Sequence, residues 1–255
     1  MPSGICTLSI IPCRKEPSST SEMVTQLLFG ETYQVLESAD DWLKISTHPD
    51  KYECWINARQ HSKISEQQLK TLKHSAECYA ADLVQLVQNS VSDVRFPVTM
   101  GASLVFCQLK TEEFAFTSEG QTVTPGKTEV SSLLSTAFLY LHAPYLWGGK
   151  TPFGIDCSGF TQMVYRLNGY QLPRDASQQV EHGEPLSFVE EAQAGDLAFF
   201  DNEAGNIVHV GILLDNQQII HASGKVRIDK FDHYGIFSPE LRGYSHHLRV
   251  IKRLL

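Results

Sequence analysis

Cys157, His209 and His221 are the residues whose types and spacing are best suited to chemistry. A cysteine acts as a nucleophile when a nearby base takes its proton and a further group orients that base. The two histidines follow the cysteine in the segments Ile-Val-His-Val-Gly and Ile-Ile-His-Ala-Ser, both of strand character. Nucleophilic catalysis is therefore one hypothesis for this chain, to be weighed against structural and metal-binding roles.

The sequence around Cys157 predicts that this residue lies in the first turn of a helix. A loop rich in glycine and proline runs from Tyr145 to Asp156, a residue type that caps helices, and Gly169 is suited to end the helix. One apolar stripe at helical spacing is formed by Phe160, Met163, Val164 and Leu167. Free N–H groups and the helix dipole favour a thiolate at this position. On these local grounds Cys157 fits a nucleophile and a small buried hydrophobe equally well.

The two histidines are expected on neighbouring strands joined by a hairpin turn at Asp215 and Asn216. Side chains alternate between the faces of a sheet, so His209 lies opposite His221 only if the loop has an odd number of residues. We therefore predict a three-residue loop such as Leu214–Asn216, or a bulge near Asp215. Imidazoles on opposite faces would exclude a joint role.

Two other roles remain open for these residues on the sequence alone. A single histidine on an apolar strand is more often a satisfied core or surface residue than a catalyst. Cys157, His209 and His221 also have the ligand types of an open zinc site. No fourth ligand is spaced for zinc, and none of the six cysteines forms a C-x-x-C pair. We expect no metal, and five reduced structural thiols besides Cys157.

Composition narrows the class of protein. The chain has 255 residues and a formal net charge of −8, which disfavours non-specific binding to nucleic acid or to anionic surfaces. No apolar run is long enough to span a membrane, and the N-terminus lacks the pattern of a secretory signal. We therefore expect no nucleic acid or membrane partner and a cytoplasmic location, or an extracytoplasmic one if a leader has been removed.

The order of the predicted elements indicates an α+β protein behind one or two small β domains. Residues 1–62 contain short strand patterns, such as Trp42–Thr47, at the spacing of a small β-barrel. Residues 63–128 are read as a linker and a second, degenerate barrel or an extension of the first, with a strand pattern over 97–106. Residues 129–255 begin with a helix over 131–141, capped by Ser131 or Ser132. Strands are then expected at 197–200, 207–214, 218–222 and 248–254.

Several blocks in residues 130–255 resemble, in order, the papain-like cell-wall cysteine peptidases of the NlpC type. They read YLWGGKTPFGIDCSGF, LPRDASQQ, AGDLAFF, NIVHVGILL and IIHAS. In the N-terminal region, DDWLKIS followed by YECWI resembles a bacterial SH3 module, with Cys54 where that pattern usually has glycine. The resemblance implies a papain-like domain, with helices packed on an antiparallel sheet, preceded by one or two SH3-like barrels.

The resemblance also implies roles for single residues. Cys157 would be the nucleophile, His209 the general base and acid, and His221 the residue that orients His209. Tyr145 matches the family tyrosine near the nucleophile, whose hydroxyl would help to hold the oxyanion. Contacts with the free amino terminus of the substrate are implied for Asp156 and Ser158, and in the SH3 module for Tyr52 and Glu22.

The implied activity is hydrolysis of the γ-D-glutamyl-L-diamino-acid bond in murein stem peptides with a free N-terminal L-alanine, in peptide recycling or turnover. No cofactor is implied, and the diamino acid is left open between lysine and diaminopimelate. Two alternatives come from other classes: a catalytically silent peptidoglycan-binding protein, and an amidase or acyltransferase built on the same fold.

Overall fold

The computed structural model describes residues 2–126 and 129–255. The chain divides into an N-terminal and a C-terminal compact unit. The N-terminal unit consists of Met1–Pro125 and Trp147–Pro152, and the C-terminal unit of Gly126–Leu146 and Phe153–Leu255. The predicted boundary between residues 128 and 129 lies outside the described residues. In the described part of the chain, no helix is long and apolar enough to cross a membrane.

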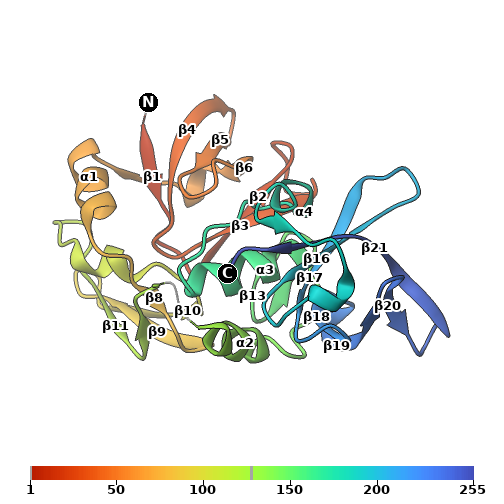
Figure 1. The fold of residues 1–255 in the computed structure, drawn as a ribbon. Helices are drawn as coiled ribbons and strands as arrows, with labels where there is room; N and C mark the ends of the chain where they lie inside the picture. The colour runs from red at the N-terminus through yellow and green to blue at the C-terminus, as the bar shows by residue number, and fades with distance from the viewer. Residues whose placement is uncertain (1, 127–128) are drawn as a thin grey trace. The chain divides into compact units, whose positions relative to one another are not determined.

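A seven-stranded antiparallel sheet forms the first part of the N-terminal unit, with the strand order β3-β2-β6-β5-β4-β1-β7 (Figure 1). Its strands are β1 (Ser3–Ile5), β2 (Ile10–Arg14), β3 (Met23–Leu28), β4 (Thr32–Ala39), β5 (Trp42–Thr47), β6 (Glu53–Asn57) and β7 (Ser62–Ile64), with a 3-10 helix η1 (Ala58–Gln60) before β7. The predicted strand over Trp42–Thr47 is correct, and its alternation buries Ile45 and Thr47.

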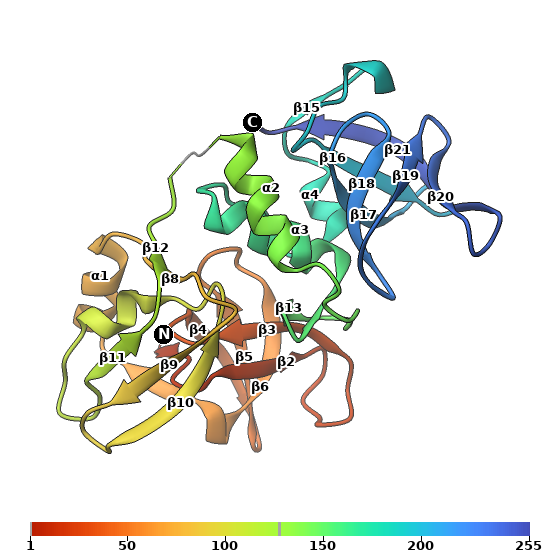
Figure 2. The same ribbon diagram turned by 90° about the horizontal axis from the view of Figure 1, so that it is seen from below.

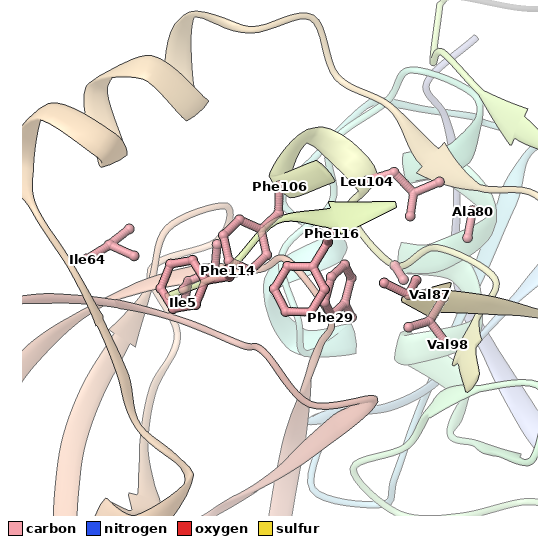
Figure 3. Packing of buried hydrophobic residues seen from close by; sticks show 11 residues of the cluster. Ile5, Phe29, Ile64, Ala80, Val87, Val98, Leu104, Phe106, Phe114 and Phe116 are labelled. Atoms are coloured by element: carbon pink, nitrogen blue, oxygen red, sulfur yellow. The ribbon is translucent and has the colours of Figure 1, made fainter. Parts of the chain in front are cut away.

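The second part of the N-terminal unit shares a hydrophobic core with the first. The shared cluster joins Ile5, Phe29 and Ile64 to Phe106 and Phe116, and Figure 3 shows these side chains together. The Phe29 and Phe116 rings meet edge to face with centroids 5.1 Å apart, a favourable aromatic geometry. This part contains α1 (Glu66–His74), β8 (Tyr79–Ala80), β9 (Val84–Asn89), β10 (Val94–Thr99), the 3-10 helix η2 (Leu104–Gln108), β11 (Phe116–Glu119) and β12 (Thr122–Val123).

The strand expected over residues 97–106 is wrong in its second half, because the chain turns after Thr99 and enters η2 at Leu104. The strands form a three-stranded sheet, β10-β9-β11, and a two-stranded sheet, β12-β8. The division of residues 1–128 into two SH3-like modules at residue 62 stays a prediction.

The segment Trp147–Pro152 belongs to the N-terminal unit although it lies just before Cys157 in the sequence. It contains the short strand β13 (Lys150–Thr151). The Lys150 ammonium is buried 3.0 Å from a Glu31 carboxylate oxygen, and the Lys150 N–H donates to the Gln26 side chain at 2.8 Å. A buried lysine requires such a partner, because an unpaired charge is costly to remove from water. These bonds hold β13 in the N-terminal unit.

The C-terminal unit contains helices and a seven-stranded antiparallel sheet with the order β15-β21-β16-β17-β18-β19-β20 (Figure 1). Strand β20 also pairs with β21, so the six strands from β21 through β16 to β20 form a closed barrel, and β15 pairs with β21 outside it. Figure 2 shows α2 and α3 side by side. The elements are α2 (Val130–Leu139), β14 (Gly154–Ile155), α3 (Cys157–Leu167), α4 (Ala176–Gln179), β15 (Glu184–Pro185), η3 (Val189–Glu191), β16 (Leu197–Asp201), β17 (Ile207–Leu213), β18 (Gln218–Ser223), β19 (Lys225–Asp232), β20 (Gly235–Ser238) and β21 (Gly243–Arg253).

The predicted cap of the helix α2 is wrong. The N-cap is Glu129, which makes no side-chain capping bond, so Ser131 and Ser132 lie inside the first turn. Strands β19 and β20 were not expected from the sequence. Strand β19 carries a residue that contacts one of the candidate histidines.

Candidate active site

Cys157 is the first residue of the helix α3, as the sequence predicts. The Asp156 side chain caps the helix, with its Oδ1 atom accepting from the Gly159 N–H at 2.7 Å. Gly169, with φ of +82°, follows the C-cap in a conformation that glycine adopts readily. The predicted apolar stripe is buried, and so is every other residue of α3. The nucleophile candidate therefore stands at the start of a fully enclosed helix.

The polar residues of α3 are buried because the loop after the helix supplies partners for them. The Thr161 hydroxyl donates to the Gln179 side-chain oxygen at 2.6 Å, and the Gln179 amide donates to the Ser158 carbonyl at 2.9 Å. The Gln162 amide donates to the Leu172 carbonyl at 3.1 Å. These bonds fix the first turns of α3, since buried polar groups are stable only when paired.

The Cys157 sulfur does not have the lowered pKa expected at a helix start. Burial, followed by the Asp156 charge, raises the pKa of the Cys157 thiol to about 12. Backbone N–H groups of Val210 and Ser158 and the Arg174 charge oppose this rise without cancelling it. The expectation of a resting thiolate is therefore wrong, because desolvation of the charged form outweighs the helix dipole. The thiol needs a base at the moment of attack.

Arg174 binds the residues on both sides of Cys157. Its guanidinium contacts both Asp156 carboxylate oxygens, at 3.0 and 2.6 Å, and donates to the Ser158 hydroxyl at 2.9 Å. The Arg174 and Asp156 side chains are only 1% and 7% exposed. Asp156, predicted to receive a substrate ammonium, is thus already paired with a buried cation. Arg174 ties the loop after α3 to the nucleophile turn.

His209 and His221 lie on neighbouring strands, β17 and β18, with their side chains on the same face of the sheet. Gly211 pairs with His221 and Leu213 with Ile219, and the Leu214 N–H bonds to the Gln218 carbonyl. The hairpin loop is therefore residues 215–217. The prediction of a three-residue loop is correct, but its position is one residue later than expected. The directly opposed pairing of the histidines is wrong, because they are diagonal neighbours.

The diagonal arrangement brings the two imidazoles into contact across Gly211. The His209 Nε2 and His221 Nδ1 atoms are 2.8 Å apart, and the rings meet edge to face. A Cβ atom at Gly211 would lie 2.8 Å from the His221 Cβ, so a larger residue there crowds His221. Both rings are buried. Both His221 nitrogens have hydrogen-bond partners, the His209 Nε2 atom and the Asp229 carboxylate, so neither is directed at a metal ion as the zinc alternative requires.

Burial keeps both imidazoles neutral. The pKa of His209 is lowered well below its ordinary value by burial and by the neighbouring His221 and His246. Burial also lowers the pKa of His221, against the opposing effect of the Asp229 carboxylate. A neutral imidazole has one bare nitrogen and can accept a proton. His209 is therefore suited to act as a general base at neutral pH.

Two residues that were not predicted contact the histidines. His246, on β21, stacks on His209 with ring centroids 4.1 Å apart. Asp229, on β19, accepts a hydrogen bond from the His221 Nε2 atom at 3.0 Å. The alternation of Val226, Arg227, Ile228 and Asp229 indicates a strand. Gly224, with φ of +67°, joins this strand to β18 in a tight turn, so a hairpin signal at Gly224 could have found the contact.

The remaining predicted residues lie in two places. Tyr145 is in the C-terminal unit, and burial, followed by the Cys157 and Asp156 charges, raises its pKa. Glu22 and Tyr52 are in the N-terminal unit. A Glu22 carboxylate oxygen accepts from the Trp147 indole N–H at 2.7 Å. Tyr52 packs against the hydrophobic cluster that includes Cys54.

The sequence of this chain is similar to two protein families and to several known proteins. Residues 142–242 match the NlpC/P60 family, and residues 13–60 match the bacterial dipeptidyl-peptidase Sh3 domain. The chain is 28% identical to a gamma-D-glutamyl-L-lysine dipeptidyl-peptidase of Bacillus subtilis (strain 168), over 86% of this chain and 74% of that protein. It is 29% identical to dipeptidyl-peptidase 6 of Lysinibacillus sphaericus, over 85% of this chain and 87% of that protein.

A solved structure shows the same fold. The crystal structure of an NlpC/P60 family protein from Bacillus cereus ATCC 10987 superimposes with a TM-score of 0.83 at 20% sequence identity. The match covers 98% of this chain and 99% of that chain. The likeness therefore extends over both units of the present chain.

Proposed function

This chain carries an NlpC/P60 domain preceded by a bacterial SH3 domain, and on that premise we propose that it is a cysteine peptidase that cleaves murein stem peptides. The observation that carries the proposal is the hydrogen bond between His209 and His221, in the domain whose helix α3 begins at Cys157. A thiol, a buried neutral imidazole and an orienting group are the parts that thiol-based acyl transfer needs. The relatives named as dipeptidyl-peptidases support peptide hydrolysis, and the name of the Bacillus subtilis relative supports the substrate class.

The proposed reaction begins with transfer of the Cys157 proton to His209. Because burial and the Asp156 charge raise the pKa of the thiol to about 12, the thiol keeps its proton until His209 accepts it. The imidazolium then gives this proton to the departing amine, and an acyl-enzyme remains. A water molecule, deprotonated by His209, attacks the thioester, and the thiol returns with release of the acid.

The negative charge on the attacked carbonyl oxygen needs hydrogen-bond donors. We assign this role to the Tyr145 hydroxyl and to the backbone N–H of Cys157 at the start of α3. The Tyr145 hydroxyl is protonated at neutral pH, as for any tyrosine, and burial raises its pKa further, so it can donate. Donors that are fixed before the reaction stabilise the transition state without a cost for reorganisation.

We propose that the substrate is an L-Ala-γ-D-Glu-L-diamino-acid peptide with a free amino terminus, cleaved after the γ-D-glutamyl group. The name of the Bacillus subtilis relative supports a γ-D-glutamyl-L-lysine bond, and diaminopimelate remains a second candidate. Asp156 and Ser158 are the proposed contacts for the ammonium. Since Arg174 already compensates the Asp156 charge, the ammonium would use the remaining lone pairs of these oxygens.

Glu22 and Tyr52 are proposed as additional substrate-binding residues of the N-terminal unit. The Glu22 carboxylate is 41% exposed and 3.4 Å from the Lys15 ammonium, so it is accessible although partly compensated. Replacing Glu22 with Gln removes its charge and keeps its shape. If it binds the ammonium, KM rises and kcat changes little.

Mass spectrometry of defined peptides tests the proposed function. The wild-type protein is expected to convert L-Ala-γ-D-Glu-L-Lys or its diaminopimelate counterpart into L-Ala-D-Glu and the free diamino acid. Cys157→Ala is expected to abolish this conversion, while Cys78→Ala, in the N-terminal unit, retains it. Acetylation of the alanine amine is expected to block cleavage. Equal cleavage of both forms would refute amine recognition, and activity in Cys157→Ala would refute the mechanism.

We propose a cytoplasmic role in the recycling of released stem peptides. The proposed requirement for a free alanine amine supports this role. Peptides still attached to glycan have no such amine. Cell fractionation with an antibody against the protein tests the location, and accumulation of tripeptide in a deletion strain tests the recycling role.

A further inference from the structure

We propose that Asp229 is a positioning residue that sets the proton positions on both histidines and leaves the Nδ1 atom of His209 as the base. The proposal rests on the proposed peptidase function for its catalytic meaning, and on four hydrogen-bonding groups for its geometry. These are the carboxylate of Asp229, the two ring nitrogens of His221 and the Nε2 atom of His209.

The proton positions follow from what a carboxylate can do. The Asp229 Oδ2 atom lies 3.0 Å from the His221 Nε2 atom, and an ionised carboxylate only accepts hydrogen bonds. His221 must therefore carry a hydrogen on Nε2. Because His221 is buried and neutral, it has a single ring hydrogen, so its Nδ1 atom is bare.

The same reasoning extends to His209. The bare Nδ1 atom of His221 lies 2.8 Å from the His209 Nε2 atom, so His209 must donate this hydrogen bond from a protonated Nε2. Neutral His209 then has its lone pair on Nδ1. That nitrogen is the one not engaged with His221, and it is the atom left to take the Cys157 proton.

Asp229 is held in the ionised form that this arrangement needs. Arg227 Nη2 donates to the Asp229 Oδ1 atom at 2.9 Å, and Arg227 Nε lies 2.8 Å from Oδ2. Burial alone would raise the pKa of Asp229, but the hydrogen bonds from His221 and Arg227 bring it below its ordinary value. Arg227 also binds the carboxylate of Glu240, at 3.1 Å.

The sheet register explains how Asp229 reaches His221. Arg227 pairs with His221 and Asp229 pairs with Ile219, so Asp229 is a diagonal neighbour of His221. The step from His209 to His221 is also diagonal. Three adjacent strands, β17, β18 and β19, thus each contribute one member of a continuous hydrogen-bonded row on one face.

During catalysis the row stabilises the charge that forms on His209. When Cys157 gives its proton to Nδ1, His209 becomes an imidazolium with hydrogens on both nitrogens. Its Nε2–H still donates to His221, which still donates to Asp229, so no bond in the row has to reverse. The negative charge of Asp229 favours the imidazolium through the polarised His221 ring.

Nitrogen-15 NMR of the uniformly labelled full chain tests the proton positions directly. Long-range proton–nitrogen correlation spectra distinguish Nδ1–H from Nε2–H tautomers of neutral histidine. Both His209 and His221 are expected as Nε2–H tautomers in the wild-type protein. An Nδ1–H tautomer at either residue would overturn the proposal, whether or not the protein cleaves murein peptides.

Variants connect the tautomers to turnover. Asp229→Ala is expected to give mixed tautomers at His221 and His209, and to lower kcat about 10- to 100-fold with little change in KM, the range seen when the carboxylate partner of a metal-ligating histidine is removed. Glu240→Ala is the matched control, because it removes the other carboxylate on Arg227 and leaves the Asp229–His221 bond in place. Unchanged tautomers in a folded Asp229→Ala, or equal kcat in the two variants, would overturn the proposal. Should Asp229→Ala fail to fold, the wild-type spectrum remains decisive.

Discussion

The Nδ1 atom of His221 lies 2.8 Å from the Nε2 atom of His209, although His221 pairs in the sheet with Gly211 and not with His209. Because the two histidines are diagonal neighbours, their rings point toward each other along the face of the sheet. The second nitrogen of each ring points away from the other ring. In His221 this nitrogen is Nε2, which donates a hydrogen bond to Asp229. Register, and not mere adjacency of strands, creates the row of hydrogen bonds.

Replacing Gly211 with alanine is expected to disturb this row. The new Cβ would lie 2.8 Å from the His221 Cβ and 2.7 Å from the Ile219 Cδ1, so the neighbouring strand must move. We expect a loss of about 1–3 kcal/mol in stability, as for overpacked cores, and a marked fall in kcat. Urea unfolding and steady-state kinetics measure the two effects.

Gly243→Ala is the control for Gly211→Ala. Gly243 also lies in this sheet, and a Cβ atom added there would meet the Leu241 carbonyl oxygen at 3.9 Å, an ordinary contact distance. This variant should retain wild-type stability and turnover. Equal behaviour of the two variants would contradict the role given to Gly211.

The acid limb of the kcat/KM profile is expected to lie well below pH 6.5. His209 must be neutral to accept the Cys157 proton, and burial, followed by His221 and His246, lowers its pKa. Activity is therefore retained as the pH falls through the ordinary histidine range, and is lost only when His209 itself becomes protonated. Circular dichroism at each pH separates this titration from acid unfolding.

The variant His246→Phe provides a second test of what lowers the His209 pKa. Phenylalanine keeps a ring against His209 but removes the neighbour whose charge lowers the His209 pKa. The acid limb should move to higher pH in this variant. An acid limb near pH 6.5 in the wild type would contradict the lowered pKa of His209, and no movement in His246→Phe would show that the His246 charge does not contribute to it.

Replacing Tyr145 with phenylalanine tests the oxyanion assignment. If the hydroxyl donates to the developing oxyanion, kcat falls about 10²- to 10³-fold while KM changes little, because the bond strengthens only in the transition state. A variant with wild-type kcat would remove Tyr145 from the mechanism. Binding of the substrate to a Cys157→Ala background checks that the pocket itself is intact.

Loss of Arg174 is expected to destabilise the C-terminal unit strongly. Arg174→Met leaves the buried Asp156 carboxylate without its cation, a change that costs about 3–5 kcal/mol in comparable sites. Arg249→Met is the matched control, since the Arg249 side chain is 64% exposed and 3.8 Å from Asp201. The control should cost about 0–1 kcal/mol. Urea unfolding of the two variants compares them, and similar losses would argue against a structural role for the Arg174–Asp156 pair.

Local sequence signals determined a substantial part of this protein. Helical spacing and the Asp156 cap placed Cys157 in the first turn of α3, and the period-two alternation of strands placed His209 and His221 on one face. The family blocks around Cys157 and His209 pointed to a cysteine peptidase before any geometry was known. These signals are reliable because they depend on residues close together in the chain.

Tertiary structure decided what local signals leave open. The stacking of His246 on His209 depends on segments that are far apart in the sequence. The two-residue shift that makes the histidines diagonal and the Asp229 contact from β19 depend on the register of the two hairpins on either side of β18. Packing also decided the ionisation state of Cys157. A helix dipole acts within one turn, but the desolvation that raises this pKa comes from the enclosure of α3 by the rest of its unit. The sequence alone therefore identified the candidate residues, and only packing decided their register and the burial that shifts their pKa values.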